Sequence, residues 1–265
     1  MQYSLMGTVK RGLKAILPRP LLKFSRILYS LLVDADAVKS YAQEGEDMIL
    51  RKLFAGRETG FYIDVGAHHP TRFSNTHYFY RRGWSGINVD ATPGSMASFQ
   101  KRRPRDINLE IAIANSKKEL TFFIFDEPAL NSFDESLSRA RDNEQPRVVR
   151  IIKEQKIMTR TLNEVLSQHM PSGQHIDFLS VDVEGLDYDV LLSNDWSKFR
   201  PECVLVECLG VLWKDLAGDM ACQFLNSCGY QIFAKTLNTA FFRDQSQKVP
   251  LPEEDNIRRI HGDIK

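Results

Sequence analysis

FYIDVGA, residues 61–67, is a short apolar strand that runs into a tight turn. Asp64 lies near the carboxyl end of the strand. Gly66 has no Cβ, so the backbone of the turn can approach a ligand closely. In open α/β sheets, ligands bind outside the carboxyl ends of the strands, where the strand order reverses. The segment therefore predicts a small-molecule site on a parallel sheet.

The composition of this turn argues against a dinucleotide. A dinucleotide fingerprint needs glycines at positions 64, 66 and 69, where this chain has Asp64, Gly66 and His69. An acid at position 64 suits a cationic ligand instead. S-adenosylmethionine carries an ammonium and a sulfonium and no phosphate, so the turn favours it. A nicotinamide-dependent oxidoreductase using the same crevice and a non-catalytic binding module are the two alternatives.

Outward from this segment, predicted helices and strands alternate from residue 41 onward. Helices are predicted at 44–54, 74–82 (with Ser74 as N-cap), 93–102, 161–169, 187–192 and 213–228, and strands at 61–65, 86–90, 107–113, 120–125, 175–183, 203–207, 230–234 and 239–243. The alternation predicts one doubly wound α/β domain with a mostly parallel sheet. We expect hairpins between 107–113 and 120–125 and between the last two strands. The polar residues 126–150 are expected to form a mobile loop or an active-site lid.

Acidic residues recur at the carboxyl ends of the predicted strands: Asp64, Asp90, Asp182 with Glu184, and Glu207. Buried negative charge at one edge of a sheet costs stability unless it binds something. Asp90 follows Gly66 by 24 residues, which suits the end of the neighbouring strand. A carboxylate there can accept both hydroxyls of an adenosine ribose.

Asp182 and Glu184 follow a strand apolar enough to be buried on both faces. They are two residues apart, so they point the same way if the strand continues. Such a pair can share a proton, hold an acceptor hydroxyl, or bind a divalent metal together with Glu207. His68, beside the expected methyl donor, is a further candidate base because histidine accepts protons near neutral pH.

The composition narrows the class of protein. The 265 residues, 43% hydrophobic and 10% aromatic, can bury a substantial core and exclude a wholly disordered chain. A net charge of +1 gives no sign of nucleic-acid binding. The four cysteines lie late in the chain, without the spacing of zinc ligands. We expect them to be reduced residues in the core of a cytoplasmic protein.

The first 33 residues contain basic side chains but no acidic ones. The first acid is Asp34, and basic residues interrupt every apolar run before it, so no signal peptide or membrane span is predicted. Residues 18–33 predict a basic amphipathic helix. Such a helix can lie on the inner face of a membrane, dock on its own domain, or contact a second subunit in a homodimer. The predicted organisation is an extension at 1–40, a catalytic domain at 41–245 and a tail at 246–265.

The chain resembles the FkbM family of methyltransferases over roughly residues 41–243. The segments that carry the resemblance are YAQEGED (41–47), FYIDVGA (61–67), SNT (74–76), GWSGI (83–87), VDA (89–91, with Pro93 following) and DFLSVDVEG (177–185). The resemblance implies a Rossmann-like class I methyltransferase fold, an α/β fold whose mostly parallel seven-stranded sheet has an antiparallel last strand. It also implies S-adenosylmethionine as donor and a sugar-bearing acceptor, methylated on a hydroxyl in a polysaccharide, glycolipid or natural product.

The resemblance also implies which residues bind the donor: Gln43, Asp64, Gly66, Ala67, Asn75, Asp90, Ala91 and Ala112. Asp64 lies at the methionine portion, Asp90 at the ribose and Ala112 near the adenine. Members of the family often have Glu-Pro where this chain has Asp90-Ala91, so its carboxylate has a shorter reach. His69-Pro70 replaces a glycine that many members have. For the acceptor, Asp182 or Glu184 is expected to orient or deprotonate the hydroxyl, with His68 as the alternative base.

Overall fold

The computed structural model describes residues 37–146 and 148–246. The chain divides into two compact units, residues 1–39 and 40–265, and the following description concerns the second. The amphipathic helix expected at 18–33 and nearly all of the tail lie outside the described residues. None of the helices in the described part of the chain is long and apolar enough to cross a membrane.

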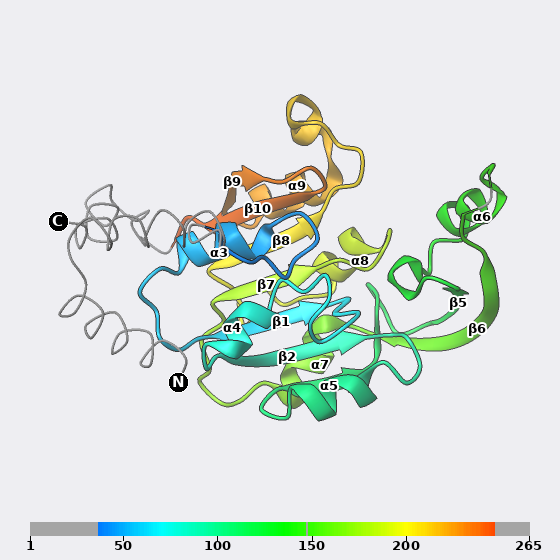
Figure 1. Ribbon diagram of the computed structural model, residues 1–265. Coiled ribbons are helices and arrows are strands. Elements are labelled where there is room, and N and C mark those ends of the chain that lie inside the picture. Colours follow the sequence, from blue (N-terminus) through cyan, green and yellow to red (C-terminus); the bar gives the residue numbers. More distant parts are fainter. Residues whose placement is uncertain (1–36, 147, 247–265) are drawn as a thin grey trace, which may run out of the picture. The chain divides into compact units, whose positions relative to one another are not determined.

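A seven-stranded sheet organises the second unit (Figure 1). Its strands, in spatial order, are β3 (Ile107–Glu110), β2 (Ser85–Asp90), β1 (Phe61–Val65), β7 (Phe178–Val181), β8 (Cys203–Glu207), β10 (Thr239–Asp244) and β9 (Tyr230–Lys235). The first five are mutually parallel, whereas β10 runs antiparallel to β8. This confirms the predicted mostly parallel sheet with an antiparallel last strand. The strand order reverses at β1, so a ligand site is expected where β1 ends.

Helices cover both faces of the sheet. They are α3 (Glu46–Leu53), α4 (His77–Arg81), α5 (Met96–Arg102), α7 (Leu162–His169), α8 (Asp187–Leu192) and α9 (Met220–Ser227). Ile63 of β1 belongs to the apolar core shared with α7, α8 and α9. Its neighbour Tyr62 belongs to the core shared with α3 and α4. Successive residues of a strand point to opposite faces, and the central strands β1 and β7 are buried on both.

A second sheet corrects the prediction for the middle of the chain. The strand predicted at 107–113 divides into β3 and β4 (Ala112–Ile113). The hairpin predicted between 107–113 and 120–125 is wrong: β5 (Glu119–Phe125) pairs antiparallel with β6 (Ile151–Arg160), and β4 pairs parallel with β6. Most residues of β6 are at least partly exposed, so its sequence lacks the apolar run that marks a buried strand.

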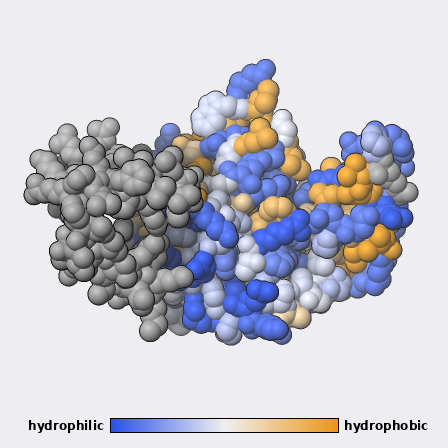
Figure 2. All heavy atoms as spheres, in the orientation of Figure 1, coloured by the Kyte–Doolittle hydropathy of each residue, from blue (hydrophilic) through white to orange (hydrophobic). Residues whose placement is uncertain are grey.

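Residues 126–150, predicted as a loop or lid, contain the short helix η1 (Pro128–Leu130) and α6 (Glu135–Asn143). The side chain of Asp134 accepts the amide of Leu137 and caps α6. We call the described residues from 119 to 160, which include β5, η1, α6 and β6, the arm. The parallel strands β1 and β2 point toward it (Figure 1). Figure 2 shows apolar residues on its surface, and Val148 and Ile152 are among its exposed apolar side chains.

The predicted helices at 44–54 and 161–169 differ from α3 and α7 by one or two residues at their ends, and the other differences are larger. The helix predicted at 213–228 is divided into η2 (Trp213–Gly218) and α9, because Asp219 caps α9 by accepting the amide of Cys222. The helix predicted at 93–102 begins at Met96. The helix predicted from Ser74 begins at His77, although the Ser74 hydroxyl still accepts the His77 amide at 3.1 Å.

The start of α7 offers a test of local stability. Thr161 Oγ1 accepts the amide of Glu164 at 3.1 Å, and Glu164 Oε2 accepts the amide of Thr161 at 3.2 Å, which together form a capping box. We expect Thr161→Ala to lower the free energy of unfolding by about 1 kcal/mol. Thr161→Ser, which keeps the hydroxyl, should cost much less in urea unfolding. Equal losses in the two variants would show that the cap contributes nothing.

Candidate active site

The turn after β1 is built against the end of β7. The amides of Gly66 and Ala67 both donate to the carbonyl of Val89, at 2.9 and 3.1 Å, which fixes the turn on β2. Gly66 has a φ of +86°, and a Cβ at this position would lie 1.7 Å from the carbonyl oxygen of Asp182. Only glycine fits here. The turn therefore brings the backbone of β1 into direct contact with the candidate acid of β7.

Two pockets meet at this contact. The β2 pocket, at the end of β2, is lined by residues that include Asp90, Ala91, Thr92, Ile111, Ile113, Phe122 and Phe133. The β8 pocket, at the end of β8, is lined by residues that include Gln43, Arg72, Phe73, Asn75, Glu127 and Glu207. Gly66, His68, Ala129, Asp182 and Glu184 line both. The shared residues are therefore where a ligand in one pocket meets a ligand in the other.

Asp90 is held rigidly at the mouth of the β2 pocket. Its Oδ2 accepts the amide of His68 at 2.8 Å and its Oδ1 accepts the amide of Thr92 at 2.7 Å. A carboxylate oxygen can accept more than one hydrogen bond, so both can still receive ligand hydroxyls. Behind Asp90, isoleucine and phenylalanine side chains form apolar walls. The β2 pocket thus combines an acceptor of hydroxyl protons with a slot suited to a flat apolar ring.

The arm closes over the β2 pocket. Asn131 Nδ2 donates to Thr92 Oγ1 at 3.0 Å, and the Ser132 hydroxyl donates to the carbonyl of Glu184. Arg141 of α6 forms an ion pair with Glu184 at 2.6 Å. About 60 Å³ of space is left in this pocket and about 230 Å³ in the β8 pocket. The β2 pocket is thus the tighter of the two.

Three carboxyl groups converge in the β8 pocket. Asp182, Glu184 and Glu207 each place an oxygen within 4.8 Å of the other two. Burial, and after it the neighbouring carboxyls, raises the pKa of Asp182 well above its usual range and that of Glu207 to about 10. Glu207 Oε2 is buried and has no partner among the described residues. The cluster therefore holds at least one proton at neutral pH and can exchange it with a bound hydroxyl.

The route by which these acids meet differs from the predicted one. We expected Asp182 and Glu184 to point the same way along a continuing strand, but β7 ends at Val181 and Glu184 has a φ of +54°. The chain turns there, and both side chains still line the same pockets. Their convergence follows from this turn and from the pairing with Arg141.

His68 lies where the two pockets join. Burial lowers its pKa, while the Asp90 carboxylate acts in the opposite direction, so its imidazole is neutral at neutral pH. Its Nε2 is buried without a partner among the described residues, and its φ is +51°. A non-glycine residue held in the left-handed region is strained, and such residues cluster at functional sites. His68 can therefore accept a proton.

Three of the residues expected to touch the donor line neither pocket: Asp64, Ala67 and Ala112. Asp64 lies on the Tyr62 face of β1, where it accepts the Thr76 hydroxyl at 2.8 Å. Ala112 points away, while Ile111 and Ile113 on either side of it line the β2 pocket. The alternation of strand residues explains the positions of Asp64 and Ala112, and their expected contact with the donor stays a prediction. Asp64 thus lies on the face of β1 that carries Thr76, and the two isoleucines form part of the lining of the β2 pocket.

The other expected donor residues lie at the pockets. Gly66, Asp90 and Ala91 line the β2 pocket, and Gln43 and Asn75 line the β8 pocket. Asn75 Nδ2 donates to Ser180 Oγ at 3.0 Å, which orients it. No pattern in the sequence indicates Phe122 and Phe133, because the arm that carries them reaches the β2 pocket only through tertiary pairing.

A buried carboxyl beside the acid cluster predicts a pH dependence of stability. Asp187 accepts the amides of Val183 and Gly185, and burial raises its pKa to about 6. The folded chain thus holds this proton more tightly than the unfolded chain. The resulting stabilisation is complete below the unfolded pKa of about 3.9 and is lost as the pH rises through about 6.

We therefore expect the free energy of unfolding to fall by about 2 kcal/mol more in the unaltered chain than in Asp187→Asn between about pH 4 and pH 7. The asparagine side chain can still accept a hydrogen bond from the backbone but does not titrate. Urea unfolding of both chains at several pH values measures the difference. Because the other buried carboxyls are common to both chains, parallel curves would contradict the assignment to Asp187.

Comparison with known proteins gives the following. The family model of the methyltransferase FkbM domain matches residues 64–232. Among solved structures, a TehB-like SAM-dependent methyltransferase from Corynebacterium glutamicum aligns with a TM-score of 0.35 and 10% sequence identity. That alignment covers 86% of this chain and 100% of the other. No curated protein matches the chain.

Proposed function

We propose that this chain, which belongs to the methyltransferase FkbM domain family, transfers a methyl group from S-adenosylmethionine to a sugar hydroxyl in a polysaccharide, glycolipid or natural product. The observation that carries the proposal is the meeting of the two pockets at Gly66, His68 and Asp182. One pocket suits a nucleoside and the other a hydroxylated acceptor. A group transferred between them passes beside residues that can take up a proton.

The β2 pocket fits the donor in three respects. Asp90 offers carboxylate oxygens for ribose hydroxyls, and the apolar walls suit an adenine ring. None of the described lysines or arginines lines this pocket, so it lacks the cations expected for a pyrophosphate. The nearby carboxylates suit a sulfonium and an ammonium group. These features favour S-adenosylmethionine over a nicotinamide cofactor. When bound, it supplies an electrophilic methyl group.

The β8 pocket supports a sugar as acceptor. Its lining combines carboxylates and amides with Phe73, which is 42% exposed although apolar and has a φ of +52°. An exposed ring beside convergent polar groups can pack against the apolar face of a sugar while its hydroxyls are hydrogen-bonded. Asp182 would orient the acceptor hydroxyl and take its proton, with His68 as the alternative. Alignment of the two reactants would supply much of the rate.

Two measurements test the proposal. Calorimetric titration should show micromolar binding of S-adenosylmethionine, about −8 kcal/mol, and none of NAD. Labelled S-adenosylmethionine should then transfer its methyl group to a glycan fraction of a host extract, located by mass spectrometry. If methyl transfer continues in the presence of a chelator, the reaction does not need a divalent metal at Asp182, Glu184 and Glu207. Binding of NAD alone would favour the oxidoreductase, and binding of neither ligand would favour a non-catalytic module.

A further inference from the structure

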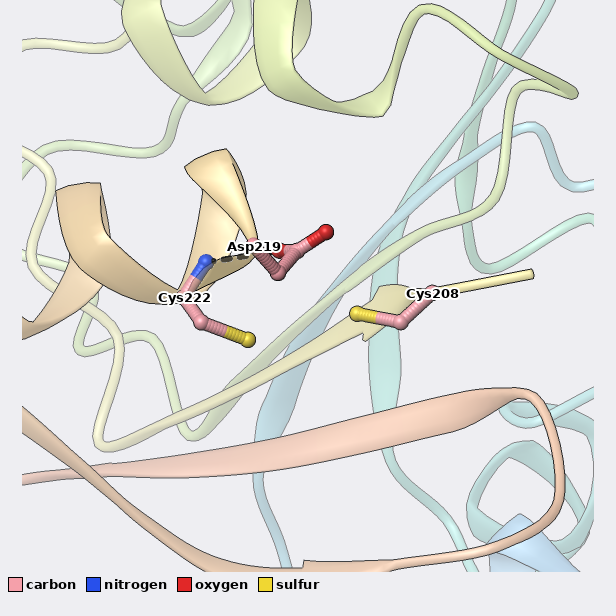
Figure 3. A group of neighbouring side chains, drawn as sticks. All are labelled: Cys208, Asp219 and Cys222. Atoms are coloured by element: carbon pink, nitrogen blue, oxygen red, sulfur yellow. Dashed lines mark hydrogen bonds between the residues drawn. The ribbon is translucent and has the colours of Figure 1, made fainter. Parts of the chain in front are cut away.

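A second group of side chains able to bind a cation lies outside the two pockets, at Cys208, Asp219 and Cys222 (Figure 3). Cys208 directly follows β8, and Asp219 and Cys222 belong to the first turn of α9. One ligand atom from each residue lies within 4.8 Å of the other two. In Figure 3 the two sulfur atoms point toward each other. Both cysteines are 3% exposed, whereas Asp219 is half-buried.

We propose that these three residues form a binding site for one zinc-class divalent cation. Zinc binds thiolate and carboxylate ligands, with bonds of about 2.3 Å to sulfur, so tetrahedral sulfur ligands lie about 3.8 Å apart. The ligand atoms all lie within 4.8 Å of one another, so small rotamer changes can bring them to this distance. Two thiolates favour zinc over magnesium or calcium, which prefer oxygen. Water can supply the fourth ligand through the side of the site at Asp219.

The backbone holds the three ligands in place without a cation. Asp219 Oδ1 accepts the amide of Cys222 at 2.9 Å, which leaves the second oxygen of the carboxylate for a ligand. The three-residue spacing puts Asp219 and Cys222 on the same side of the helix. The amide of Cys208 donates to the carbonyl of Asn238 on the neighbouring turn. A strand end and a helix start thus present the ligands from rigid elements.

The charges around the site distinguish it from the other acidic groups of the chain. Two other groups of side chains have the spacing of metal ligands, His175 with Asp177 and Glu202, and Asp182 with Glu184 and Glu207. Each already has a cationic partner, because Arg57 pairs with Asp177 and Glu202 and Arg141 pairs with Glu184. Within the described ranges no lysine or arginine pairs with Asp219. A bound divalent cation would balance the charge of Asp219 and of two thiolates at this place.

Cobalt titration of the reduced, chelator-treated full-length chain tests the site, because Co²⁺ reports thiolate ligands by absorption. We expect one equivalent of Co²⁺ to give thiolate charge-transfer and tetrahedral d–d bands that Zn²⁺ abolishes. Cys208→Ser and Cys222→Ser should each weaken binding at least about 100-fold. Asp219→Asn keeps a side chain that can cap α9 but loses the charge, and should weaken binding about 10-fold. Cys228→Ser is the matched control and should bind normally.

Absence of thiolate bands in the unaltered chain would overturn the proposal. So would normal binding in Cys222→Ser together with loss of binding in Glu207→Gln, because that result places the ion in the β8 pocket. If a serine variant fails to fold, alkylation of the unaltered chain decides: Zn²⁺ should slow the modification of Cys208 and Cys222 but not of Cys228. Equal protection of all three would contradict the site. None of these readouts depends on methyl transfer.

Discussion

Replacing Gly66 with alanine is expected to abolish donor binding and to lower the free energy of unfolding by at least about 4 kcal/mol. The new Cβ would lie 1.7 Å from the carbonyl oxygen of Asp182 and 2.6 Å from its carbonyl carbon. Neither strand can move away cheaply, because the Asp182 amide donates to Val65 and the Gly66 amide donates to Val89. The clash must push the turn of β1 away from the end of β7, which displaces the edge that both pockets share.

Gly56→Ala is the matched control for this variant. Gly56 has a φ of +85°, close to the +86° of Gly66, but apart from its chain neighbours no atom of residues 37–146 or 148–246 lies within 4 Å of its Cβ position. Alanine there costs only the strain of the left-handed backbone, about 1–2 kcal/mol. Urea unfolding and calorimetric titration with S-adenosylmethionine should therefore separate the two variants clearly. Equal losses of stability, with donor affinity intact in both, would show that the close approach at Gly66 has no functional role.

The sheet could be predicted from the sequence because parallel strands buried on both faces are continuous apolar runs. β1 and β8 begin and end at the predicted residues. The arm could not be predicted in the same way. β6 is largely exposed and polar, and its partner β5 lies about 30 residues earlier in the chain. Its pairing depends on contacts that no local pattern records.

The same distinction applies to the site. Asp90 and Asp182 come together because the carboxyl ends of parallel strands share one edge of the sheet, which the sequence can indicate. Glu184 reaches the same edge through the turn that follows β7. Asp64 was expected there too, but its position in the strand alternation puts it on the other side, against Thr76. Ile111 and Ile113 could have been found by the same alternation, as the neighbours of Ala112. The arm's phenylalanines could not.

Replacing Asp182 with asparagine is expected to lower kcat between about 10²- and 10⁴-fold while leaving the affinity for S-adenosylmethionine measurable. Asp182 lines both pockets, and its raised pKa makes its ionised form a stronger base than an ordinary carboxylate. Asparagine has nearly the same size and resembles the protonated acid, so it preserves the packing around Gly66. It can still orient an acceptor hydroxyl but cannot take its proton.

The comparison with His68→Gln decides between the two candidate bases. His68 is neutral, and its buried Nε2 has no partner within the described part of the chain, so it too can accept the acceptor's proton. If Asp182 is the base, Asp182→Asn should lose most of its turnover, and the activity that remains should no longer depend on an ionised carboxyl. If Asp182→Asn keeps full activity while His68→Gln loses it, the imidazole is the base and Asp182 serves only to orient the hydroxyl. Rates measured at saturating donor across the pH range separate these cases, because a neutral amide at position 182 supports orientation but not proton transfer.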